Sequence, residues 1–215
     1  MALFAVLLVA VLATLGWRLL VPRVRVEDDE SPDFASLVTG QSTLAVALAA
    51  VLAGQVLWLT PQSHWWLWVP YLGLGLPLVA VDLRTTFLPL RLNYLVAGAM
   101  AACLVPLTVH DWRSGVGALA GAAALFALFH LVWRFARGIG YGDVRLALLV
   151  GAVSGMAGVQ FAALALLAGT ALGAVHAIAH AIWARRDPAR ERHFAYGPAL
   201  WAGPIVAALL SPIVG

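Results

Sequence analysis

The chain contains no lysine, a single cysteine and few charged residues of either sign. Charged residues make up 11% of its 215 residues, about half the usual fraction in a soluble domain. One cysteine, Cys103, rules out a disulfide scaffold. Apolar residues make up 63% of the sequence, and its mean hydropathy is +0.93. Since a soluble core of this size cannot bury that much apolar chain, the composition excludes a compact soluble enzyme or a disordered tail and predicts an integral membrane protein.

Apolar runs of roughly 20 residues, the length that crosses a bilayer, recur along the whole chain. We expect an all-α, polytopic transmembrane helical bundle of about eight spans, at residues 2–21, 43–59, 66–82, 93–110, 115–133, 144–158, 160–183 and 198–214. The sixth span is short, and Gly151, Gly155 and Gly158 make this region easy to bend. The sixth and seventh spans are therefore predicted either as two helices or as a broken, re-entrant pair. The first has no basic residue before it, which indicates an uncleaved anchor.

Connections rich in arginine alternate with connections that have almost none. Residues 22–42, 83–92, 134–143 and 184–197 hold ten of the arginines, whereas the intervening connections hold only Arg113. Because cytoplasmic loops keep the excess of positive charge, we expect these four connections in the cytoplasm and both termini outside. Arginines confined to short connections do not form one basic face, so we expect no nucleic-acid partner.

Two other clusters have an ordinary explanation. His176 and His180 are four residues apart and share a helix face, a spacing that suits a metal site. No third ligand is evident near them, so we predict packing or interhelical hydrogen bonds and no metal. Four tryptophans around the connection between the second and third spans are predicted to anchor the chain at the bilayer surface. They are Trp58, Trp65, Trp66 and Trp68.

Acidic residues are costly at membrane depth and tend to be kept there for a function or a partner. Of the ten, five form an acidic segment between the first two spans, two lie in the last basic connection and one lies in an outer connection. The remaining two, Asp82 and Asp143, close the third span and open the sixth, and the arginine pattern places both at the cytoplasmic boundary. An ordinary helix N-cap would explain Asp143. It explains Asp82 less well, because a carboxylate at the C-terminal end of a helix meets the unfavourable pole of the helix dipole.

Glycines surround Asp143 on its N-terminal side. Gly138, Gly140 and Gly142 remove three Cβ atoms where the chain enters the membrane. Such glycines let another backbone approach closely. A solvated loop has no need of this spacing, whereas an extended peptide lying against the carboxylate would use it.

Three motifs together resemble the type IV prepilin peptidases, the GxGD membrane aspartyl proteases. They occur in the order and spacing of that family and cover about residues 66–215. The motifs are Asp82 with Pro89 seven residues later, Gly140-Tyr141-Gly142-Asp143 followed by Val144-Arg145-Leu146, and Tyr196-Gly197-Pro198-Ala199-Leu200. The resemblance implies a catalytic membrane domain at residues 66–215, preceded at residues 1–65 by two transmembrane helices with an acidic cytoplasmic loop.

The resemblance also implies a function. Asp82 and Asp143 would be the catalytic pair, cleaving the basic leader from prepilin or pseudopilin precursors at the cytoplasmic face of the bacterial inner membrane, in type IV pilus assembly or protein secretion. The implied partners are this precursor peptide and the lipid bilayer, with no cofactor and no metal. Substrate positioning or an active-site loop is implied for Pro89, Gly140, Tyr141, Gly142, Arg145, Gly197 and Pro198.

The chain departs from the family pattern in three places. It has Leu90 where an acid or amide usually follows the proline, and Arg145 where lysine is usual, a change that keeps the charge. Its first cytoplasmic loop has about 20 residues and no cysteine, whereas many bacterial members carry cysteine pairs in a large loop associated with N-methylation. We therefore expect a short form without N-methyltransferase activity.

Two other functions fit the same residues. A transporter or proton-coupled channel could use both aspartates as a proton relay, but it would be expected to hold ionisable groups near the bilayer midplane. A catalytically inactive scaffold of the assembly machinery would not need an intact aspartate pair.

Overall fold

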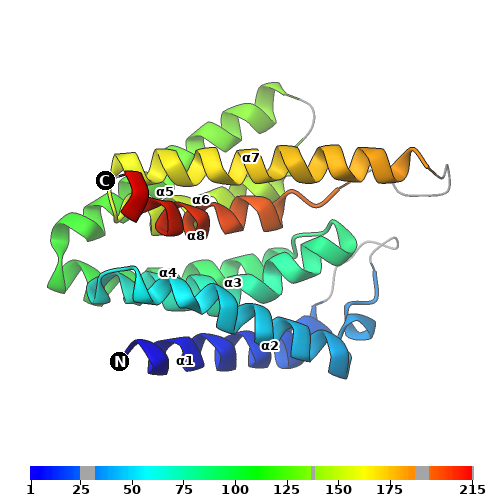
Figure 1. Ribbon diagram of the computed structural model, residues 1–215, viewed down its shortest axis with the longest axis horizontal. Coiled ribbons are helices and arrows are strands. Elements are labelled where there is room, and N and C mark those ends of the chain that lie inside the picture. Colours follow the sequence, from blue (N-terminus) through cyan, green and yellow to red (C-terminus); the bar gives the residue numbers. More distant parts are fainter. Residues whose placement is uncertain (25–31, 137–138, 187–193, 215) are drawn as a thin grey trace.

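A computed structural model describes residues 1–24, 32–136, 139–186 and 194–214, and these residues form a helical bundle without strands (Figure 1). The predicted all-α bundle of about eight spans is confirmed. Its helices are α1 (Ala2–Leu15), α2 (Gly40–Gly54), α3 (Trp65–Thr85), α4 (Leu90–His110), α5 (Trp112–Phe135), α6 (Tyr141–Gly155), α7 (Val159–Ala184) and α8 (Gly197–Val214).

Six helical segments of the described chain are long and apolar enough to cross a membrane. They contain α1, α2, α3, α4, α5 and α7. Helix α6 has 15 residues, which at 1.5 Å per residue is about 22 Å, less than a hydrocarbon layer of about 30 Å. In both α6 and α3, most residues are buried. The two helices that carry Asp82 and Asp143 therefore form the centre of the bundle.

Local sequence explains where α3 ends. Thr86 adopts the left-handed conformation, with φ 56°, and its N–H donates to the carbonyl oxygen of Asp82 at 2.7 Å. Pro89 has an extended backbone and directly precedes α4. Because proline disfavours a helical conformation in the residue before it, α3 does not run on into α4. The chain therefore leaves α3 one turn after Asp82 and makes a tight turn into α4.

Glycines join α5 to α6. Gly117 and Gly121 of α5 face Gly151 and Gly155 of α6 so closely that a Cβ on any of them would collide with the backbone of the other helix. Small residues four apart allow this kind of contact between membrane helices. Gly151 and Gly155, which were predicted together with Gly158 to make this region easy to bend, lie within α6 and pack it against α5. The chain turns instead at Gly158, where φ is 102°.

Two aromatic side chains join α3 to α8. The Tyr71 hydroxyl donates to the carbonyl oxygen of Trp201 at 2.7 Å, and the Trp201 indole N–H donates to the carbonyl oxygen of Tyr71 at 3.3 Å. The two rings are stacked with their centroids 5.8 Å apart. These reciprocal bonds fix the register of α8 against α3, and so they determine what the start of α8 meets.

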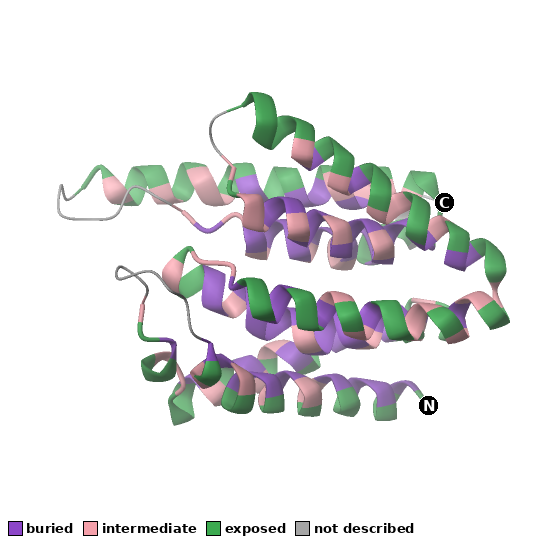
Figure 2. Cartoon of the chain, turned by 180° about the vertical axis from the view of Figure 1, so that it is seen from behind, coloured by how far each residue is buried: buried purple, intermediate pink, exposed green. Residues whose placement is uncertain are grey.

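The arrangement of the ends agrees with an even number of crossings. Both termini lie at one end of the bundle, and the turn from α3 to α4 lies at the other (Figure 1). Exposed residues follow the outer faces of the helices, and buried ones follow the faces that meet (Figure 2). Of the predicted tryptophan anchors, Trp58 and Trp66 are exposed, but Trp68 is fully buried against Tyr71. The anchor prediction is therefore wrong for Trp68, which is a core residue.

Candidate active site

Asp82 lies in the last turn of α3 and is 3% exposed. Its Oδ2 accepts a hydrogen bond from the N–H of Gly197, the first residue of α8, at 3.0 Å. The N–H groups at the start of a helix have no partner within it, and they carry its positive pole. The positive pole at the start of α8 therefore stabilises the Asp82 carboxylate, whereas the negative pole at the end of α3 destabilises it.

Gly197 has to be glycine for this contact to form. A Cβ at position 197 would lie 2.5 Å from Oδ2 of Asp82, closer than carbon and oxygen atoms pack. The predicted site residue Gly197 therefore lies directly on the carboxylate. Pro198, the next predicted residue, occupies the first turn of α8, where proline is tolerated because its missing N–H would have no helical partner.

Asp143 is the third residue of α6 and is 8% exposed. Its Oδ2 accepts a hydrogen bond from the N–H of Gly140 at 3.1 Å. The N-cap of α6 is Gly140, and Asp143 reaches back to it from inside the helix, as acidic residues do in a capping box. Asp143 is therefore not the N-cap of α6. It is the third helical residue, and it accepts a hydrogen bond from the N-cap.

The two carboxylates line one cavity of about 720 Å³. The cavity is bounded by the α3–α4 turn, the start of α6, the middle of α7 and the segment before α8. Its other lining residues are Thr86, Phe87, Leu88, Ile139, Gly140, Gly142, Gly173, Ala174, Ala177, Phe194 and Tyr196.

The predicted glycines of the GxGD motif have different roles. A Cβ at Gly142 would lie 2.8 Å from Cβ of Leu88, so glycine there lets the α3–α4 turn close over the start of α6. A Cβ at Gly140 would be 3.7 Å from Oδ2 of Asp143, an ordinary contact. Gly140 therefore contributes its N–H, whereas Gly142 contributes the absence of a side chain.

Tyr141 and Arg145 brace α6 from outside the cavity. The guanidinium of Arg145 lies 4.9 Å from the centroid of the Tyr141 ring, which packs edge-to-face on Trp133 at 4.9 Å. Neither side chain lines the cavity. Pro89, buried in the α3–α4 turn, and Leu90, exposed on α4, do not line it either.

Tyr196 was missed as a site residue, although it directly precedes Gly197. Its ring fills the space left by Gly173 of α7 and stacks on Phe129 with centroids 6.5 Å apart. Burial raises the pKa of the Tyr196 phenol, and the charge of Asp143 raises it further. The phenol of Tyr196 therefore stays protonated in the cavity wall. Gly173 carried no motif that would have revealed this contact.

His176 and His180 lie beside the cavity. Their ring centroids are 6.4 Å apart, and Phe194 packs on both. With Arg84 they line a smaller cavity of about 250 Å³, which shares Thr86 and Phe194 with the larger one. Among the described residues, no three or more His, Cys, Asp or Glu side chains are grouped so that they could hold a metal ion.

Part of the sequence prediction concerns residues outside the described chain. Residues 27–30 of the acidic segment belong there, as do Arg137 and Gly138 before the GxGD motif. Asp33, the last acidic residue of that segment, is described, and its Oδ1 accepts a hydrogen bond from the N–H of Ala35 at 3.0 Å.

Comparison with known proteins agrees with this geometry. No curated protein and no solved structure shows significant similarity to the chain. The model of the type IV leader peptidase family matches residues 63–178, more than half of the sequence. The matched region runs from the start of α3 into α7 and includes both Asp82 and Asp143. The chain therefore belongs to the type IV leader peptidase family, and it is a multi-pass membrane protein.

Proposed function

We propose that the chain is an intramembrane aspartyl endopeptidase that removes the basic leader from type IV prepilin-like precursors. The observation that carries this proposal is the position of Asp82 and Asp143, which come from two central helices and line one cavity. Each binds one backbone N–H through Oδ2. Since no described residue bonds Oδ1 of either carboxylate, we assign this atom to water or substrate.

The chemistry follows from two carboxylates that share one proton, as close acidic pairs do. The ionised carboxylate accepts a proton from a water molecule whose oxygen attacks the scissile carbonyl carbon. The protonated carboxylate donates a hydrogen bond to the carbonyl oxygen, which gains negative charge. The tetrahedral intermediate then collapses, the carbon–nitrogen bond breaks, and the leaving amine takes up a proton from the pair. Water and two carboxylates supply every atom that this sequence requires.

The cavity lies at the end of the bundle where the arginine-rich connections are, which supports a cytoplasmic site in the bacterial inner membrane. There, the basic leader of a prepilin or pseudopilin would reach Asp82 and Asp143 while its apolar segment stays in the bilayer. We assign catalysis to residues 66–215 and, because the first loop has no cysteine, no N-methyltransferase activity.

Substitution of each aspartate by asparagine tests the mechanism, since an amide keeps the shape but cannot exchange the proton. We expect Asp82→Asn and Asp143→Asn each to abolish cleavage of a precursor in proteoliposomes and to leave the protein membrane-inserted. Asp111→Asn is the matched control, because Asp111 caps α5 at the opposite end of the bundle and asparagine caps equally well. Full activity in either catalytic variant would refute the mechanism. If the parent cut no peptide and the two aspartate variants lost ion or solute flux, the proton relay would be supported instead.

A further inference from the structure

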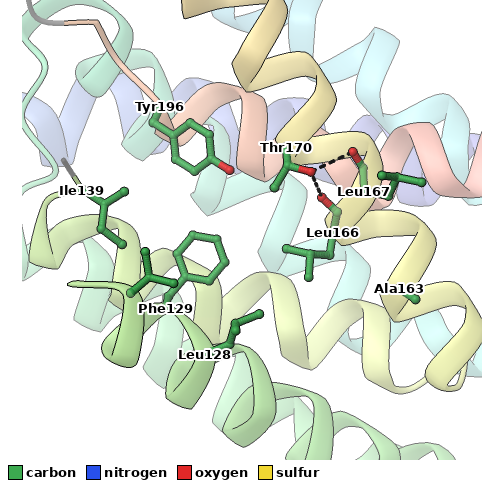
Figure 3. Close-up of a pocket in the computed structure, with 9 residues that line it drawn as sticks. Leu128, Phe129, Ile139, Ala163, Leu166, Leu167, Thr170 and Tyr196 are labelled. Atoms are coloured by element: carbon green, nitrogen blue, oxygen red, sulfur yellow. Dashed lines mark hydrogen bonds between the residues drawn. The ribbon is translucent and has the colours of Figure 1, made fainter. Parts of the chain in front are cut away.

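An apolar groove between α5 and α7 adjoins the candidate active site. Its volume is about 470 Å³ (Figure 3). The only polar group on its α7 wall is Thr170, and its hydroxyl donates to the carbonyl oxygens of Leu166 and Leu167 at 2.9 and 3.0 Å. The groove therefore offers an almost purely apolar surface. Its lining residues are Leu128, Phe129, Val132, Ile139, Ala163, Leu166, Leu167, Thr170 and Tyr196.

The groove adjoins the cavity that holds the two aspartates. Ile139 and Tyr196 line both spaces. Along α7, four residues from Ala163 to Thr170 line the groove, and the next turns, from Gly173 to Ala177, line the aspartate cavity. At 1.5 Å per residue, the α7 wall of the groove is about 10 Å long. A chain held at the aspartates would thus reach the groove by passing Ile139 and Tyr196.

The direction of the groove matches the order of parts in the proposed substrate. Helix α7 starts at the end of the bundle that carries both termini and finishes at the end that carries the aspartates (Figure 1). The groove therefore leads from Asp82 and Asp143 into the apolar layer. A precursor with its leader at the cytoplasmic surface places the residues after the scissile bond in this direction.

We propose that the groove binds the apolar segment that follows the scissile bond, an inference that rests on the proposed function. A lipid chain is the competing occupant, and it is as apolar as a leucine side chain. The substrate segment prevails because the bond held at the aspartates raises its local concentration at the groove. Groove contacts should therefore decide which precursor binds, and not how fast a bound peptide bond is cut.

The test uses two substrates and two substitutions in the α7 wall of the groove. Ala163→Phe fills the groove, and Leu167→Ala removes one of its apolar contacts; both residues are exposed, so neither change disturbs the core. Ala102→Phe, at an exposed position on α4, is the matched control. The substrates are a full precursor and a leader peptide that ends two residues after the scissile bond.

For the full precursor we expect Ala163→Phe and Leu167→Ala to raise KM by about three- to tenfold with kcat unchanged, because packing alone is lost. For the short peptide, both variants should match the parent, and Ala102→Phe should match it with both substrates. An unchanged KM for the full precursor would mean that lipid fills the groove, and equal losses with both substrates would mean that the groove acts through the aspartates. Either result overturns the inference. If the parent cuts neither substrate, the proposed function fails instead.

Discussion

Replacing Gly197 with alanine tests the contact that holds Asp82. The new Cβ would lie 2.5 Å from Oδ2 and 3.3 Å from Cγ of Asp82, and 3.3 Å from Cδ2 of Leu146. Either α8 or the carboxylate has to move. Because Tyr71 and Trp201 tie α8 to α3 through two hydrogen bonds, we expect the carboxylate to move and to lose the Gly197 N–H.

The cost follows from the nature of the lost bond. A hydrogen bond to a charged group contributes about 1.5–3 kcal/mol. Since about 1.4 kcal/mol corresponds to a factor of ten, kcat/KM for a precursor should fall by roughly 10- to 150-fold. Alanine is a better helix former than glycine by about 1 kcal/mol, which offsets only part of this loss, so the temperature of thermal unfolding should fall by only a few degrees. The expected result is therefore a loss of activity in a protein that remains folded.

Cleavage of a precursor in proteoliposomes measures the effect, with Gly98→Ala as the control. A Cβ at position 98, on α4, would have no atom within 4 Å, so this variant should cut like the parent. Parental kcat/KM for Gly197→Ala would refute the reasoning, because it would show that the Asp82 contact is not needed. An equal loss in Gly98→Ala would show that any added methyl group is harmful, and would refute it as well.

Two further predictions concern topology and charge. Reporters fused at Arg84, Arg137 and Arg190 should score as cytoplasmic, and a reporter at Arg113 should score as external. If Arg84 and Arg137 scored on opposite sides, the membrane would separate the two aspartates, and the catalytic pair would be refuted. Neutralising the four acids at residues 27–30 should lower kcat/KM at low salt with little change in kcat, because surface charges speed encounter and are screened over about 8 Å at physiological ionic strength. Identical salt profiles for parent and variant would leave this segment as a solvated loop.

The fold was largely predictable because hydropathy alone locates membrane helices. Residues 2–21, 66–82 and 160–183 correspond closely to α1 with its extension, α3 and α7. Hydropathy does not say which face of a helix meets a neighbour. For that reason Trp68 was assigned to the bilayer surface although it is buried, and Trp66 two residues earlier is exposed.

Packing partners that are distant in sequence explain what the sequence did not reveal. The flexibility of Gly151 and Gly155 could be inferred from residue type, but their partners Gly117 and Gly121 lie on another helix. The same holds for Gly173, which accommodates Tyr196. The motifs contain the two aspartates, whose roles remain a prediction. A cavity wall built from several chain segments has no local signature.

One physical device connects the three sequence motifs. Each aspartate is held by a glycine N–H at the start of a helix, Asp143 by Gly140 at α6 and Asp82 by Gly197 at α8. A helix N-terminus offers unpaired donors and a favourable potential for a carboxylate. At Gly197, only the lack of a Cβ lets the donor come so close. The third motif thus compensates for the position of Asp82 at the unfavourable end of α3, which explains why a motif 115 residues away belongs to the same site.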